Sequence, residues 1–189
     1  MEKVLQDKRL YEFLKKVDDD FADTVKSRGC DHCGQVLHRA DFERKPRGLR
    51  AGPSWDRRYS FCCSREGCRK RHTPPSVRFL GRKVYVGVIV VLVSAMMHGP
   101  NEHRLKRLQQ ELTIDRRTLK HWRQWWTEIF VKYAFWKAER GRFRGQISRA
   151  QMPFCLVQTF GAQQMEGMVR LMKFFSPITT QSCPEVLAM

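Results

Sequence analysis

The sequence predicts a mainly α-helical protein with a small zinc-stabilised β ribbon and a tri-helical helix-turn-helix core. Three observations lead to this fold class. Two cysteine pairs with metal-ligand spacing lie in a Gly-, Pro- and Arg-rich segment, residues 28–80. Apolar side chains recur at three- and four-residue steps on both sides of that segment. The longest apolar run, Val84–Met97, separates the ribbon from the last basic helix.

The net charge of +17 lies in the middle of the chain. Residues 28–100 carry +10 and residues 101–150 carry +8, between ends of −1 and zero. This distribution is typical of a surface that faces phosphate. We expect four regions: an N-terminal amphipathic helix (1–27), a zinc ribbon with an arginine-rich loop (28–80), a helix-turn-helix domain (81–150), and an apolar C-terminal helix and tail for packing or partner docking (151–189).

Residues 2–26 have the periodicity of an amphipathic helix, with Lys and Asp opposite its apolar side chains. The apolar positions are Leu10, Leu14, Val17, Phe21 and Val25. We predict that this helix packs on the body of the protein. The alternative is a dimerisation helix.

The expected helix-turn-helix begins with Val84–Met97, which suits a buried strand as well as a helix. The stop signal Gly99-Pro100, followed by the N-cap residue Asn101, favours the helix. A second, leucine-bearing helix then leads to a turn at 113–115, with Asp115 as the N-cap of the third helix.

The third helix has one apolar face, predicted as a single stripe: Leu119, Trp122, Trp126, Ile129, Tyr133 and Trp136. Its opposite face is basic, as in a recognition helix that enters the major groove. Arg and Lys pair with guanine, and Gln pairs with adenine. The expected DNA contacts on this helix are Arg116, Arg117, Lys120, His121, Arg123 and Gln124.

A basic loop interrupts the ribbon between residues 43 and 58, with six Lys or Arg, two Pro and two Gly. We expect it to be mobile, as either a solvated insertion or an arm that follows phosphates or enters a minor groove. The arm would use Arg47, Arg50, Arg57 and Arg58. Downstream, contacts to the phosphate backbone are expected from Arg140, Arg142, Arg144 and Arg149.

The cysteines indicate a metal site. Residues 1–26 lack a signal-peptide pattern, so we expect a reducing, cytoplasmic and nucleoid-associated location and no disulfide framework. In Cys30-x2-Cys33 one tight turn can place both sulfurs on an ion. The second pair is Cys63-x4-Cys68, where Cys62 or His72 could replace Cys63. We predict structural Zn²⁺ held by Cys30, Cys33, Cys63 and Cys68.

We expect no membrane span, no small-molecule substrate and no enzymatic activity. The apolar run is shorter than the roughly 20 residues that span a bilayer. P-loop, dinucleotide-binding and zinc-deaminase motifs are missing from the sequence. After Asp115 the acids are four glutamates and no aspartate, which does not suit a three-carboxylate, two-metal nuclease.

The chain resembles the front half of bacterial insertion-sequence transposases and related short mobile-element proteins over about residues 28–136, in the stretches CDHCG, RYSFCCSREGCRKRHTPPS and LKRLQQELTIDRRTLKHWRQWW. Those families place a zinc ribbon before a helix-turn-helix that binds transposon ends. The resemblance implies DNA binding. The acidic residues after Asp115 do not match the nuclease of this family, so the resemblance does not imply strand transfer.

The expected function is therefore recognition of double-stranded DNA by an accessory or regulatory factor of a mobile element. A second copy of the chain, or a recombinase or transposase, is an expected protein partner. Two alternatives stay open. One is an RNA-binding module, in which Trp55 or Trp125 would stack on bases. The other is a scaffold subunit of a nucleoprotein complex with little sequence specificity.

Overall fold

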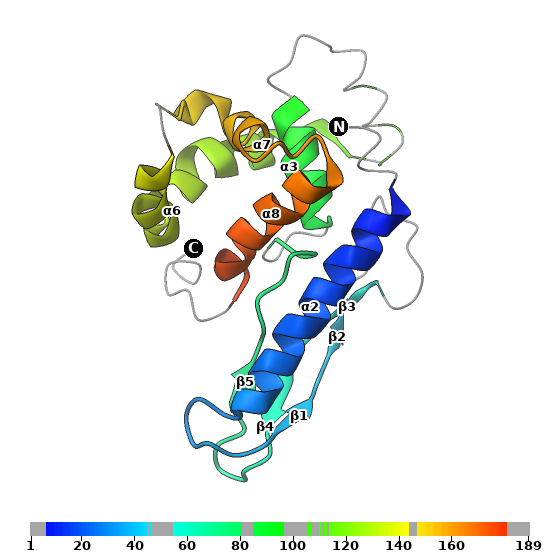
Figure 1. The fold of residues 1–189 in the computed structure, drawn as a ribbon, viewed down its shortest axis with the longest axis vertical. Helices are drawn as coiled ribbons and strands as arrows, with labels where there is room; N and C mark the ends of the chain where they lie inside the picture. Colours follow the sequence, from blue (N-terminus) through cyan, green and yellow to red (C-terminus); the bar gives the residue numbers. More distant parts are fainter. Residues whose placement is uncertain are drawn as a thin grey trace.

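The computed structural model describes residues 7–44, 46, 55–80, 85–96, 106, 110, 112, 114–143 and 147–180. The chain is mostly helical, with two small antiparallel sheets (Figure 1). Its α-helices are α2 (Lys8–Arg28), α3 (Gly87–Met96), α5 (Arg116–Gln124), α6 (Ala134–Glu139), α7 (Phe154–Thr159) and α8 (Met165–Phe175). Its shorter turns are the π-helical η1 (Trp125–Ile129) and the 3₁₀ turns η2 (Phe130–Lys132), η3 (Arg140–Arg142), η4 (Arg149–Gln151) and η5 (Ser176–Thr179). Its strands are β1 (Leu37–Arg39), β2 (Phe42–Glu43), β3 (Arg57–Arg58), β4 (Phe61–Cys63) and β5 (Arg71–His72).

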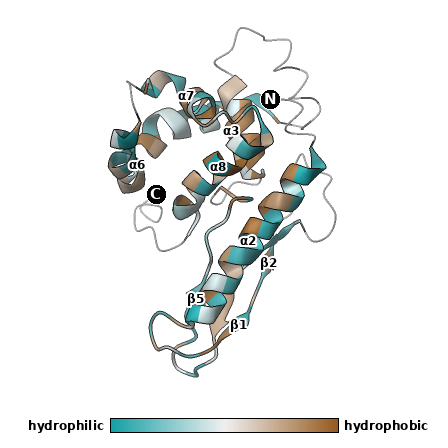
Figure 2. Cartoon of the chain, in the orientation of Figure 1, coloured by the Kyte–Doolittle hydropathy of each residue, from teal (hydrophilic) through white to brown (hydrophobic). Residues whose placement is uncertain are grey.

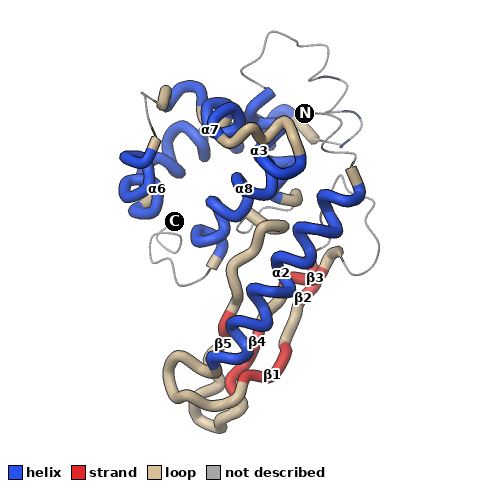
Figure 3. The backbone as a smooth tube through the Cα atoms, in the orientation of Figure 1, coloured by secondary structure: helices blue, strands red, loops and turns tan. Residues whose placement is uncertain are grey.

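The elements form two halves. Figure 3 shows the strands beside α2, and α3, α6, α7 and α8 gathered at the other end of the molecule. No helix in the described ranges is long and apolar enough to cross a membrane.

Helix α2 begins at the N-cap Asp7, whose side chain accepts a hydrogen bond from the Arg9 N–H at 3.0 Å. It ends at Gly29, where φ is +77° and the N–H donates to the carbonyl of Lys26. Of the predicted apolar face, Leu10, Leu14 and Val17 are buried and Phe21 and Val25 are partly buried. The prediction that this helix packs on the body of the protein is confirmed.

The ribbon is a three-stranded sheet in the order β1-β4-β5 and a separate β2–β3 pair. In the first sheet Leu37 pairs with Cys63 and Phe61 pairs with His72. In the second, Phe42 pairs with Arg58. The C-terminal part of α2 covers the first sheet, so a small apolar cluster forms from Ala22, Cys30, Leu37, Tyr59, Phe61 and Cys63.

The helical half is built around α3, whose ten residues are all buried. Figure 2 shows it as one of the most apolar elements of the chain. Helix α3 contacts α5, α7 and α8. A helix that is apolar on every side needs neighbours all around it. The helical interpretation of Val84–Met97 is thus confirmed over 87–96.

The predicted third helix stays helical as far as Lys132, but it loses α-helical geometry after Gln124, and its continuation through Tyr133 is wrong. The chain forms the π-helical turn η1, in which the N–H of Phe130 donates to the carbonyl of Trp125. Phe130 takes the inner position expected for Ile129, and its ring packs against Trp125 and Trp126 with centroids 5.6 and 5.2 Å apart. The helix then breaks at Tyr133, where ψ is 138°. Packing of adjacent tryptophans against one phenylalanine therefore overrides regular helical spacing.

The second helix of the expected helix-turn-helix lies almost wholly outside the described residues, so the tri-helical core stays a prediction. The end of the turn matches what we expected. Ile114 is buried, and the Asp115 side chain accepts a hydrogen bond from the Thr118 N–H at 2.7 Å.

Helices α7 and α8 pack against the rest of the helical half. Met168, Met172 and Phe175 are buried, so these side chains pack within the chain. Gly167 lies against the preceding turn, where a Cβ atom would overlap the carbonyl oxygens of Gly161 and Phe160.

A buried ion pair joins the two halves. Arg78 Nε donates to Asp18 Oδ2 at 2.7 Å, and both side chains are inaccessible to solvent. Asp18 also accepts hydrogen bonds from the Ser76 hydroxyl at 2.6 Å and the Val77 N–H at 2.7 Å. On its other side the Arg78 guanidinium donates to the carbonyl of Arg57 at 3.1 Å.

Replacing Asp18 with Asn should lower the free energy of unfolding by about 3–5 kcal/mol, because it leaves the buried Arg78 guanidinium without a countercharge. Urea unfolding measures the change. Asp20→Asn, at an exposed position of the same helix, is the matched control and should change stability little. Equal losses in both variants would contradict the role given to the ion pair.

Replacing Gly167 with Ala should destabilise the protein by roughly 1–3 kcal/mol, since the added methyl group meets backbone atoms that cannot rotate away. Thermal unfolding measures the effect. Gly141→Ala is the control, because a Cβ there meets nothing within 4 Å. A Gly167→Ala variant as stable as the wild type would contradict this close packing.

Candidate metal centre

The first cysteine pair is held by a tight turn after α2. The Cys30 carbonyl accepts hydrogen bonds from the N–H groups of Cys33 at 3.2 Å and Gly34 at 2.8 Å. The Cys30 N–H donates to the carbonyl of Gln35 at 2.9 Å and closes the turn. Gly34 has φ +71°, a left-handed conformation that costs glycine little. The turn brings the sulfurs of Cys30 and Cys33 into one cluster.

The second pair uses the same turn with two extra residues. Here the Arg65 carbonyl accepts hydrogen bonds from the N–H groups of Cys68 at 3.1 Å and Arg69 at 3.2 Å. The closing hydrogen bond runs from the Cys63 N–H to the carbonyl of Lys70 at 2.9 Å. Arg69 has φ +42° at the position that glycine holds in the first turn. The two extra residues explain why four residues separate Cys63 from Cys68, whereas two separate Cys30 from Cys33.

Strand β4 decides which of its two cysteines can bind the ion. Side chains alternate between the faces of a strand, so Cys62 and Cys63 point to opposite sides. Cys63 is fully buried beside Leu37. The Cys62 thiol instead donates to the carbonyl of Arg69 at 3.5 Å. The structure therefore places Cys63, not Cys62, in the cluster.

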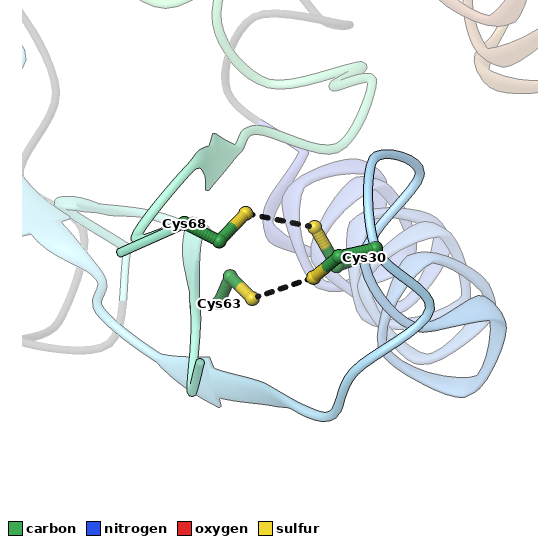
Figure 4. Close-up of side chains that lie close together, drawn as sticks. Cys30, Cys63 and Cys68 are labelled. Carbon is green, nitrogen blue, oxygen red and sulfur yellow. Dashed lines mark hydrogen bonds between the residues drawn. The ribbon is translucent and has the colours of Figure 1, made fainter. Parts of the chain in front are cut away.

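The four predicted sulfurs converge on one point. The Cys30 and Cys68 sulfurs are 3.8 Å apart and the Cys33 and Cys63 sulfurs 3.4 Å apart. All four lie within 4.8 Å of one another, and Figure 4 shows the sulfurs of Cys63 and Cys68 pointing toward the Cys30 side. Four thiolates about 2.3 Å from a tetrahedral ion lie about 3.8 Å apart. The donor set therefore fits a tetrahedral metal ion with no open position.

Backbone N–H groups prepare two of the thiols to ionise. The N–H of Gln35 donates to the Cys33 sulfur and lowers the pKa of that thiol to about 7. Burial opposes ionisation of Cys30, but hydrogen bonds from the His32 and Cys33 N–H groups and from the His72 side chain together lower the pKa of this thiol. At Cys63, burial raises the pKa to about 12. Binding of a metal must therefore displace a proton from Cys63, and metal affinity should fall as the pH falls.

His72 lies next to the cluster and not in it. Its Nε2 is 3.3 Å from the Cys30 sulfur, and its Nδ1 is 3.4 Å from the Asp31 carboxylate. In the tautomer that carries its proton on Nε2, the imidazole can donate a hydrogen bond to a metal-bound thiolate. The sequence alternative in which His72 replaces a cysteine ligand is not needed, because four cysteines already complete the set.

The predicted recognition residues in α5 all lie on its exposed side: Arg116, Arg117, Lys120, His121, Arg123 and Gln124. The buried side chains of Leu119 and Trp122 orient the helix and leave this face to solvent. Gln124 donates to the Glu128 carboxylate at 3.1 Å.

Arg58 was expected to contact DNA, and the structure corrects this. Its side chain is buried, and its guanidinium donates to the carbonyls of Pro74 and Thr179. Burial lowers its pKa to about 10, so it stays charged and serves packing between β3 and the C-terminal segment. Its strand neighbour Arg57 is exposed.

The other predicted DNA contacts are placed as follows. Arg142 is exposed and pairs with Glu139 at 2.7 Å. Arg47, Arg50 and Arg144 lie outside the described residues, as does most of the expected basic loop.

Comparison with protein-family models, with curated proteins and with solved structures finds no match to this chain. The likeness to insertion-sequence transposases therefore rests on the motifs alone.

Cys63→Ser should abolish stable metal binding, whereas Cys62→Ser should leave it intact, because only the first residue points into the sulfur cluster. Metal content after purification with zinc measures this, with one ion per chain expected for the wild type and Cys62→Ser. Chelation should also disorder the ribbon, which circular dichroism and proteolysis would report. Retention of zinc by Cys63→Ser would contradict the assigned ligand set.

Proposed function

We propose that this protein is a zinc-containing factor that binds double-stranded DNA through the exposed face of α5. The observation that supports this best is the composition of that face. Helix α5 carries four Arg or Lys and one His, all exposed, and no acidic residue. Such a face attracts phosphate and offers donors to base edges.

The dimensions of α5 suit the major groove. Nine residues at about 1.5 Å per residue give a helix about 14 Å long, and the groove is about 12 Å wide. The N-terminal end holds Arg116 and Arg117 near the positive pole of the helix dipole, where phosphate binding is favoured. Lys120 and Arg123 follow on the same side and can reach guanine N7 and O6. Gln124 would exchange its hydrogen bond with Glu128 for one with adenine.

The cysteine cluster supports zinc as the structural ion. Thiolates are soft ligands, and a closed set of four is typical of structural zinc sites. The ion would join two turns far apart in the sequence and so hold the ribbon on the C-terminal end of α2. With no position open on the metal, we assign it no part in chemistry.

We further propose an accessory or regulatory role in a mobile genetic element, in which the chain binds element ends and a second copy or a separate recombinase acts on them. Support comes from the order of a cysteine ribbon before a basic helix, as in the transposases that the sequence resembles.

Selection from a random duplex library with the zinc-loaded protein tests the DNA proposal. An enriched motif is expected, and Lys120→Glu should abolish enrichment because it reverses a charge in the middle of the recognition face. Lys26→Glu, the same change at an exposed position near the end of α2, is the control and should retain the motif. Tight binding without enrichment would overturn sequence-specific recognition and favour a scaffold. Preference for RNA over the same duplex sequence would favour the RNA-binding alternative.

A further inference from the structure

A groove of about 670 Å³ lies between the segment 131–141 and residues 147–152. Its described lining includes four cations, Lys132, Lys137, Arg140 and Arg149, together with apolar side chains. No acidic side chain is among these described lining residues. The groove is therefore a concave and strongly positive site.

The helix break at Tyr133 creates this concentration of charge. Lys132 ends η2, and Lys137 lies in α6 on the other side of the break. Residues five positions apart lie on different faces of a regular helix, so the two lysines line one groove only because the chain breaks between them. Arg140 follows at the end of α6.

The fourth cation is held from the opposite wall. Arg149 Nε donates to the backbone carbonyl of Thr127, which fixes this side chain against η1 while leaving the residue exposed. The acid nearest to Arg140 in the sequence, Glu139, pairs with Arg142 at 2.7 Å. Arg142 is not among the lining residues, so this pair does not neutralise the four cations.

The floor of the groove is apolar and rigid. Trp136 is buried, and its ring packs on Phe130 and Phe143 with centroids 5.4 and 5.7 Å apart. Met152 is also buried, so the apolar surface that the groove offers to a ligand comes from the half-buried Val131 and Ile147 above them. A ligand that matches this site places negative charge at the rim of the groove and a flat apolar surface against the floor of the groove.

We propose that this groove binds a single-stranded segment of nucleic acid, with phosphates on the four cations and an unpaired base on the apolar floor. Single-strand sites combine a basic groove with apolar and aromatic surfaces in this way. A duplex turns its phosphates outward and keeps its base faces stacked inside, so it has no apolar surface to place on the half-buried Val131 and Ile147. The inference extends the proposed function, since it adds a strand-binding site beside the duplex-binding face of α5.

The test measures fluorescence anisotropy of the zinc-loaded protein with a labelled oligothymidylate and, separately, a labelled hairpin duplex. The variant is Lys132→Gln with Lys137→Gln, two exposed lysines of the groove that are not among the expected duplex contacts. The charge-matched control is Lys8→Gln with Lys16→Gln on the exposed side of α2. Zinc content and thermal unfolding confirm that each variant is folded. If the double variant does not fold, the two single variants replace it.

The groove variant should weaken oligothymidylate binding roughly tenfold or more and reduce the salt slope by about 1.4, for two lost phosphate contacts at about 0.7 each. It should bind the duplex like the wild type. Lys120→Glu should show the reverse pattern, and the control should change neither.

Three results would overturn the proposal: no oligothymidylate binding by the wild type, unchanged binding by the groove variant, or equal losses for both probes, which would make the groove part of the duplex surface. Competition by free thymidine monophosphate as effective as that by the oligomer would also overturn it in favour of a nucleotide site. Failure of the proposed function would give a different result: the wild type would not bind the duplex, or Lys120→Glu would bind it as well as the wild type.

Discussion

One buried carboxylate connects all parts of this structure. Asp18, in the middle of α2, accepts three hydrogen bonds from the segment 76–78, among them the ion pair with Arg78. The Arg78 side chain continues to the carbonyl of Arg57 in β3, and its own carbonyl accepts the N–H of Gly87, the first residue of α3, at 2.7 Å. An isolated charge is expensive to bury, so both groups must keep these partners once they leave water. The ribbon, the long helix and the helical half therefore all make contact with one polar cluster, which lies beside the apolar core that they share.

The metal centre depends on a second kind of constraint, the covalent spacing of the cysteines. Each pair lies in a turn closed by backbone hydrogen bonds, and the antiparallel register of β1 and β4 carries the turns to the same end of the sheet. The ribbon has only a small apolar cluster of its own, too small to fold by burial alone. A metal ion held by both turns would close the loop between them and supply the missing stability. The strand thus matters most for its alternation, which turns Cys63 inward and Cys62 away.

In the helical half, the packing of aromatic side chains determines which surfaces carry the Lys and Arg residues. Trp125, Trp126 and Phe130 crowd one side of the chain, and the π-helical turn lets all three contact one another. The cations of α5 before this turn form a convex basic face, and those after the break line a concave groove. One basic stretch of sequence therefore produces two surfaces of opposite shape. Their different curvature is the physical basis for the two proposals, duplex DNA on the convex face and an unpaired strand in the groove.

The sequence by itself determined that the two cysteine pairs come together, the helical character of residues 8–28 and the cap at Asp115, because each depends on local spacing or local hydrogen bonding. It favoured a helix over a strand for 87–96 and left open whether Cys62 or His72 replaces Cys63, which the structure decided. It could not reveal the Asp18–Arg78 pair, the burial of Arg58 or the break at Tyr133. Asp18 and Arg78 are 60 positions apart and have no periodic pattern that links them. In the sequence, nothing distinguishes Arg58 from the other arginines of the basic loop. Only the pairing of β3 with β2 and the hydrogen bond from its guanidinium to Thr179 show that it is buried. Such features depend on contacts between distant residues, and only the tertiary structure decides which charges are buried and which face solvent.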